Sequence, residues 1–191
     1  NQVAFDDDYK DNQETEIEDT QLAPTDDREA AIVATLPPGN YTAILRGKTN
    51  GIGEVEVYDL DSTSATHLVN ISTRAFVGPD DNSALIGGFI VDGQVSRQIL
   101  IRAIGPSLTG AGVSGALADP TIDFYRGSQL ILSNDNWKSD DQAAIAATGI
   151  PPTNDKEAAI LVNLDPGSYT AVVRGKDHTT GVALVEVYQM P

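Results

Sequence analysis

Hydrophobic and polar residues alternate along most of this chain with the period of two that is typical of β-strands. The alternating segments are short, and Gly, Pro, Asp and Asn residues, which favour turns, separate them. The pattern predicts strands at residues 67–77, 84–91, 97–104, 121–126, 128–132, 158–164, 169–174 and 183–189.

The pattern also occurs at residues 30–36, 41–46 and 54–60, because the chain contains an internal repeat. A shift of 128 positions aligns residues 6–48 with residues 134–176 and gives 20 identities in 43 pairs. The longest matches are EAAI and the pair PGNYTAILRGK and PGSYTAVVRGK, and VEVY recurs at a shift of 130. We call residues 1–60 segment B, residues 61–133 segment A and residues 134–191 segment B′. The chain therefore contains one A segment and two B segments.

Segment A and one B segment together carry about eight short strands, which is typical of a β-sandwich or jelly roll. The sequence predicts an all-β fold, with a complete β-sandwich repeat over residues 61–191. Residues 1–60 are expected to form a half-repeat, a three-strand sheet in which Tyr41 occupies the same place as Tyr169 in the other copy. Helix is expected only at residues 140–147 and at the corresponding residues 12–19.

Composition excludes several classes of function. The net charge is −16, and residues 1–60 alone carry 14 acidic and 4 basic residues, so a nucleic-acid backbone would be repelled. The longest apolar run is too short to span a membrane, and cysteine is absent, which excludes disulfides and thiolate chemistry. The first residue is Asn1 rather than Met, and we interpret the chain as mature and exported.

Catalysis is not expected, because the chain offers few groups that act as bases. The only histidines are His67, at the start of a predicted strand, and His178, in a loop that differs between the copies. Paired carboxylates occur by chance in so acidic a chain, and Trp137 is the only tryptophan available for a sugar platform. We interpret the protein as a non-enzyme.

Two acidic loops at matching places in the repeat form the best candidate site. DDDYKD, from residue 6, aligns with NDNWKSDD, from residue 134, and hard oxygen ligands of this kind favour calcium. A second cluster, TDDRE beside TNDKE, precedes the first strand of each B segment. The alternative is that Asp and Asn only form turns and cap the short helix. The candidate ligands are Asp6, Asp7, Asp8, Asp11, Asn134, Asp135, Asn136 and Asp140.

Several long motifs resemble a known type of module. RQILIRAIGPSL, VSGALADPTIDFYRGSQLILSNDNW, GSYTAVVRG and TGVALVEVY resemble a repeat of large secreted proteins of verrucomicrobial and related bacteria. The chain is more distantly similar to pre-peptidase C-terminal domains, in which an acidic loop precedes an LPxGxYT strand. The resemblance implies export and a β-sandwich, and it transfers no catalytic residue.

Two functions remain open on the sequence alone. The first is an extracellular structural protein, a filament or surface-layer subunit in which the surplus B segment joins copies head to tail, by strand addition to a neighbour. The second is a calcium-stabilised accessory module for adhesion or for binding carbohydrate or matrix. The repeat and its surplus half-copy favour the first.

Overall fold

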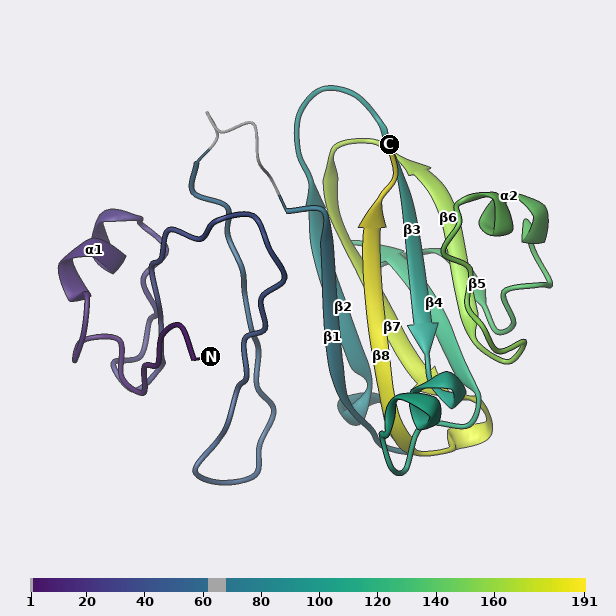
Figure 1. Cartoon of the computed structure of the whole chain (residues 1–191), viewed down its shortest axis with the longest axis horizontal. Coiled ribbons are helices and arrows are strands. Elements are labelled where there is room, and N and C mark those ends of the chain that lie inside the picture. The colour runs from purple at the N-terminus through teal and green to yellow at the C-terminus, as the bar shows by residue number, and fades with distance from the viewer. Residues whose placement is uncertain (1, 62–67) are drawn as a thin grey trace. The chain divides into compact units, whose positions relative to one another are not determined.

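The computed structural model describes residues 2–61 and 68–191 and divides the chain into two compact units. The N-terminal unit is Asn1–His67 and the C-terminal unit is Leu68–Pro191 (Figure 1). The strand prediction that starts at residue 67, and the prediction for His67, begin outside the described residues.

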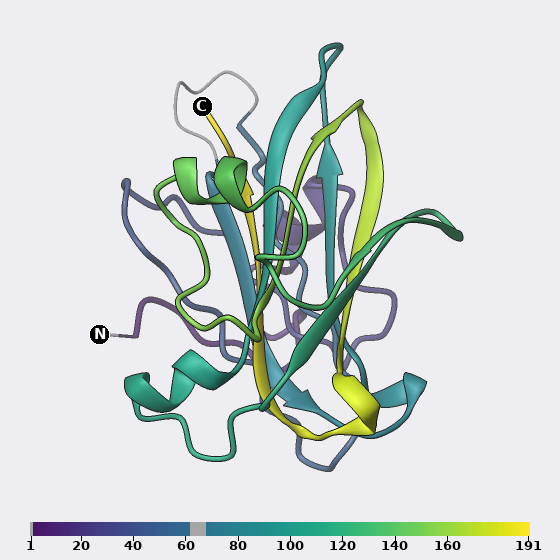
Figure 2. The ribbon, with the colours of Figure 1, turned by 90° about the vertical axis from the view of Figure 1, so that its right-hand side faces the viewer.

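The C-terminal unit is a β-sandwich of two four-stranded antiparallel sheets, which confirms the predicted fold class (Figures 1 and 2). The first sheet has the order β1-β8-β3-β6 and the second has the order β2-β7-β4-β5. The strands are β1 (Asn70–Val77), β2 (Leu85–Val91), β3 (Arg97–Ile104), β4 (Pro120–Arg126), β5 (Gln129–Asn134), β6 (Ala158–Leu164), β7 (Gly167–Gly175) and β8 (Gly181–Gln189).

Each of these strands lies within a few residues of its predicted position. In β2, β4 and β7 buried side chains alternate with more exposed ones, as the sequence pattern indicates. In β4, for example, Ile122 and Phe124 are fully buried while Thr121 and Asp123 are not. Phe124 stacks with Phe89 and Tyr169 at ring-centroid distances of 6.0 and 5.6 Å in the core between the sheets.

Short helical elements lie in the connections. The helix α2 (Gln142–Ala147) follows β5, within the helix predicted at residues 140–147, and it buries Ile145. Short 3-10 turns are η1 (Asp81–Ser83), η2 (Pro106–Ala111) and η3 (Lys176–His178). The β4–β5 hairpin turns at Gly127, whose φ of 57° is in the region that favours glycine.

The three strands that segment B′ contributes do not lie next to one another. β6 pairs with β3, β8 lies between β1 and β3, and β7 lies in the other sheet between β2 and β4. The prediction that a B segment forms a three-strand sheet of its own is therefore wrong. The strands of B′ are interleaved with the strands of segment A, and they obtain all their sheet hydrogen bonds from it.

The N-terminal unit has no such partner strands. Its described residues, 2–61, contain one helix, α1 (Glu14–Asp19), and no strand. The strands predicted at residues 30–36, 41–46 and 54–60 are therefore wrong for this structure. The sequence pattern is that of strands, but a strand forms only where another strand pairs with its backbone, and residues 1–60 include no counterpart of β1–β4.

Candidate functional site

The acidic loop of segment B′ begins where β5 ends, at Asn134. The side chain of Asn134 is buried, and its Oδ1 accepts the backbone N–H of Ala159 at 3.0 Å. Its Nδ2 donates to the backbone oxygen of Asn136 and to Asp140, each at 3.3 Å. Asn134 thus ties the end of β5 to the start of β6 and holds the loop between them.

The acidic loop of segment B makes the same hydrogen bonds at the same offset. The Oδ2 of Asp6 accepts the backbone N–H of Ala31 at 3.1 Å, as Asn134 does from Ala159. The backbone N–H of Tyr9 donates to the oxygen of Glu29 at 2.9 Å, and the equivalent bond from Trp137 to Glu157 measures 2.8 Å. The loop therefore has one local hydrogen-bonding pattern, which forms with or without the sandwich.

The ion pairs of the two loops also correspond. Asp135 pairs with Lys176 at 2.5 Å, and Asp7 pairs with Lys48 at 2.8 Å. These hydrogen bonds to a carboxylate raise the pKa of Lys176 and of Lys48. A second matched pair links each loop to the following acidic cluster, Lys138 with Asp155 and Lys10 with Asp27.

The eight predicted calcium ligands are thus mostly held by protein groups. Asn136, for example, donates through Nδ2 to Asp135 at 3.1 Å, whereas Asp8 and Asp11 are joined by a hydrogen bond between their backbones. Within residues 2–61 and 68–191, no group of three or more His, Cys, Asp or Glu side chains lies close enough together to hold a metal ion. Calcium binding stays a prediction.

Two carboxylate oxygens near this loop are buried without a hydrogen-bond partner. They are Oδ1 of Asp135 and Oδ1 of Asp119, a residue of segment A that the sequence did not single out. The backbone N–H of Lys176 donates to the carbonyl oxygen of Asp119, and the ammonium of Lys176 pairs with Asp135. A lysine therefore already supplies positive charge where a bound cation would lie.

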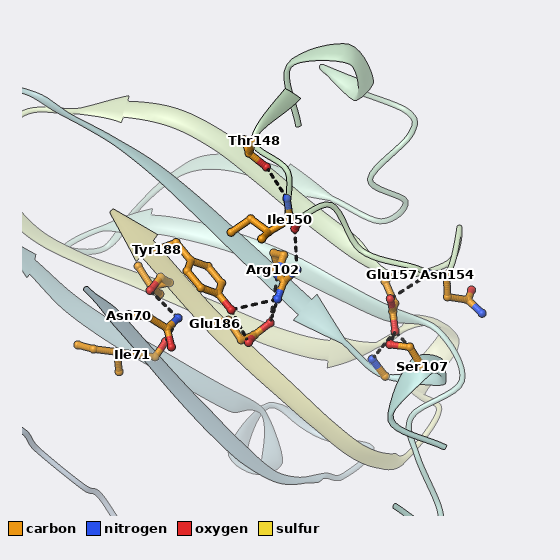
Figure 3. Close-up of polar contacts among 12 residues, drawn as sticks. Asn70, Ile71, Arg102, Ser107, Thr148, Ile150, Asn154, Glu157, Glu186 and Tyr188 are labelled. Atoms are coloured by element: carbon orange, nitrogen blue, oxygen red, sulfur yellow. Dashed lines mark hydrogen bonds and ion pairs between the residues drawn. The ribbon is translucent and has the colours of Figure 1, made fainter. Parts of the chain in front are cut away.

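Glu157 is a position whose importance the sequence did not show. It is fully buried, and Oε1 accepts the backbone N–H groups of Gly105 and Ser107 at 3.2 and 2.9 Å, together with the Ser107 hydroxyl (Figure 3). Its other oxygen accepts the N–H of Asn154 at 3.2 Å. A carboxylate that satisfies three donors of the turn after β3 connects segment B′ to segment A.

A second connection of this kind is the pair Arg102 and Glu186, on neighbouring strands β3 and β8. Their side chains are 15% and 11% exposed, and Arg102 Nη2 lies 2.5 Å from Glu186 Oε2 (Figure 3). Arg102 also donates to the carbonyl oxygen of Ile150 at 2.6 Å, and its guanidinium stacks on the ring of Tyr188. Burial, followed by the hydrogen bond to Glu186, raises the pKa of Tyr188.

In segment B the counterparts of these two glutamates are Glu29 and Glu56. Oε2 of Glu29 accepts the N–H of Asp26 at 3.3 Å, which repeats the local bond of Glu157. Glu56 accepts the hydroxyl of Tyr58 at 2.9 Å, which repeats the bond between Tyr188 and Glu186. The described N-terminal unit repeats neither the turn donors of Gly105 and Ser107 nor the ion pair of Arg102.

The contacts of Asn134, Glu157 and Arg102 hold strands and loops in place.

The histidine that the structure describes lies on an exposed loop. His178 Nδ1 is 3.1 Å from the carbonyl oxygen of Pro79. In the part of the chain that the structure describes, no helix has the length and apolar character needed to cross a membrane.

No model of a known protein family matches the chain, and no curated protein matches it. Among solved structures, it is similar to the pre-peptidase C-terminal domain of collagenase from Bacillus anthracis. The sequence identity is 13% and the TM-score is 0.39, over 62% of this chain and 89% of that one. A similarity of this size does not define a function.

Proposed function

We propose that this chain is an extracellular structural protein, a subunit of a filament or surface layer, which is joined to a neighbouring molecule through residues 1–60. The C-terminal unit is a complete sandwich and supplies the stable body of the subunit. The N-terminal unit supplies the connection. The resemblance of the repeat motifs to secreted bacterial proteins supports an extracellular location.

One observation carries the proposal: the same sequence pattern is folded into the sandwich in one copy and left without strands in the other. Six apolar side chains of segment B′ are at most 9% exposed, while their counterparts in segment B are between 45% and 56% exposed. The buried six are Ile160, Leu164, Tyr169, Val173, Val185 and Val187, and the exposed six are Ile32, Leu36, Tyr41, Leu45, Val55 and Val57.

Covering these side chains would stabilise an assembly. Burial of a half-exposed side chain of this size contributes on the order of 1 kcal/mol, so six of them favour association before the ordering cost is subtracted. New strand pairing would also satisfy backbone N–H and C=O groups of residues 30–60. Because the connecting surface differs from the surface it meets, each addition leaves a new end, which produces an open fibre unless the rotation closes a ring.

Electron microscopy and light scattering of the purified chain test the proposal. The full chain is expected to form ordered polymers at high concentration, and a variant that lacks residues 1–60 is expected to remain a folded monomer. The second unit keeps its own core, so the deletion is not expected to unfold it. The proposal is wrong if the full chain stays monomeric or if the shortened chain still polymerises.

A further inference from the structure

We infer that each copy of this chain holds residues 39–47 of a neighbouring copy as an added strand, which pairs with the open edge of β2. This inference rests on the proposed function and names the surface that the N-terminal unit contacts on its neighbour. Every copy carries both the strand and the edge, so the same contact repeats from one copy to the next.

The sandwich is open on the side where β1 and β2 are the edges of the two sheets (Figure 1). On β1, Ile71, Thr73 and Ala75 lie opposite core residues of β8 and share their inward face. All three are nevertheless exposed, and Ile71 is 37% exposed. The reason is that β2 lies over β8 rather than beyond it, since a Cβ on Gly87 would meet Val185 at 3.0 Å.

The opposite side of the sandwich is closed. The edges there are β5 and β6, which contact each other across the core. The inward-facing residues Ala158, Ile160 and Leu164 of β6 are at most 6% exposed. A strand added beside β2 would therefore give the inner face of β1 the cover that β5 gives to β6.

The backbone of β2 can pair with such a strand. Within the described residues its only strand partner is β7, on one side. In an antiparallel strand alternate residues direct their N–H and C=O groups away from that partner. The sequence of β2, LIGGFIV, contains neither a charged residue nor a proline, which are the usual protections of an edge strand against pairing.

Residues 39–47 fit this edge because they repeat the strand that β2 already pairs with. Their sequence, GNYTAILRG, matches GSYTAVVRG of β7 at six of nine positions. β7 has an antiparallel neighbour on each side, so this sequence is suited to pairing of that kind. Residues 39–47 form no strand in the single chain, and we therefore place the pairing between two copies.

The register of β2 with β7 also suits the inner face of the added strand. In that register Tyr41 lies opposite Phe89 and Leu45 lies opposite Leu85, as their counterparts in β7 do. Alternation then directs both side chains inward, over the exposed inner face of β1. The added strand buries apolar side chains of its own and covers those of the acceptor.

The outer face and the charges agree with the same register. Ile44 lies opposite Ile86, and the two side chains are 66% and 56% exposed. Arg46 lies beside the acidic turn that precedes β2, where its counterpart Arg174 pairs with Asp81 at 2.9 Å. Asp81 is 87% exposed, and Arg46 has no ion-pair partner among the described residues of its own unit. Both contacts use side chains that the single chain leaves exposed.

Cysteine cross-linking of the full chain tests the inference, because the chain has no cysteine of its own. The variant Ile44→Cys with Ile86→Cys is assembled and treated with a short thiol-reactive cross-linker. A ladder of linked multimers is expected on a denaturing gel. The matched control is Ile44→Cys with Leu130→Cys, since Leu130 is 51% exposed on β5, the other edge of the same sheet. The control is expected to give no ladder.

Three results of this experiment would overturn the inference. They are the absence of a link between positions 44 and 86, an equal ladder from the control, and a linked monomer. A linked monomer would mean that each chain fills its own β2 edge.

A charge at the same edge tests the contact without a cross-linker. Ile86→Lys is expected to raise the concentration at which half of the chain is assembled by about ten-fold, whereas Leu130→Lys should leave it unchanged. Ile86 is more than half exposed, so the melting temperature of the sandwich should be preserved. Ile44→Glu added to Ile86→Lys should recover part of the assembly, because the two charges then lie opposite each other. Unchanged assembly of Ile86→Lys would contradict the inference.

These outcomes are separate from the test of the proposed function. Polymers that form without a link between positions 44 and 86 would leave the filament correct and the β2 edge wrong. Linked closed dimers without polymers would leave the β2 edge correct and the filament wrong.

Discussion

Residues 6–60 and residues 134–191 are two copies of one sequence pattern in two states of folding. Their acidic loops share the hydrogen bonds from Tyr9 to Glu29 and from Trp137 to Glu157, and the helices α1 and α2 lie at the same offset. Their strands differ completely, because the strands of the second copy pair with strands of segment A, whereas the described residues 2–61 contain no strand. Local hydrogen bonds suffice for the loop, whereas strand formation depends on distant partners.

The largest effect is expected for a matched pair of tyrosines. Tyr169 is buried in the aromatic stack, while Tyr41 is 46% exposed, although each hydroxyl donates to a backbone oxygen four residues earlier at 2.8 Å. Tyr169→Ala should lower the free energy of unfolding by roughly 3–5 kcal/mol. Tyr41→Ala should change it by less than about 0.5 kcal/mol in the monomer. Urea denaturation measures both, and equal losses would show that the copies are folded alike.

The next largest loss of stability is expected for variants of the ion pair between Arg102 and Glu186. Arg102→Leu leaves a largely buried carboxylate without its cation and should cost roughly 3 kcal/mol of unfolding free energy. The double variant Arg102→Leu with Glu186→Leu should recover most of that loss, because two apolar side chains need no partner. Glu56→Leu is the control in the other copy and should be close to neutral in the monomer. If the double variant does not regain stability, an unpaired charge is not the cause of the loss in Arg102→Leu.

A smaller loss is expected at Glu157. Glu157→Gln removes the charge from an acceptor of three donors and places an amide donor in a buried site, which should cost about 2 kcal/mol. Glu29→Gln, at the matching place, should cost only a few tenths of a kcal/mol in the monomer. Thermal unfolding of the two variants compares them directly. A large effect of Glu29→Gln would mean that its carboxylate already has partners like those of Glu157.

Calcium is expected to have the smallest effect on stability among these tests. If the loop at Asp135 binds calcium, the melting temperature of the C-terminal unit should rise between chelator and millimolar calcium, because the ion binds the folded state. Asp135→Ala should reduce the shift, and Asp7→Ala, in the other loop, should leave it unchanged. An identical melting temperature in chelator and in calcium would end the calcium prediction.

The sequence predicted the strands of the sandwich well, but it did not predict where strand formation stops along the chain. All eight strands of the C-terminal unit lie near positions that alternation and turn residues predict, and each has partner strands within the same unit. The same alternation gave three false strands in residues 30–60, since periodicity reports which face a strand would bury and is silent on whether a partner exists. Glu157 and Arg102 could not be recognised as docking residues, because their partners are 50 and 84 positions away in sequence.

Hydrogen exchange of backbone amides in the intact chain tests the central claim most directly, because it compares the two copies within one sample. In dilute solution, amides of residues 158–189 are expected to exchange slowly and those of residues 30–60 rapidly. On assembly, residues 30–60 should become protected with the alternating pattern of the complete copy. Slow exchange of residues 30–60 in the dilute monomer, or rapid exchange that persists in the assembled state, would contradict the account.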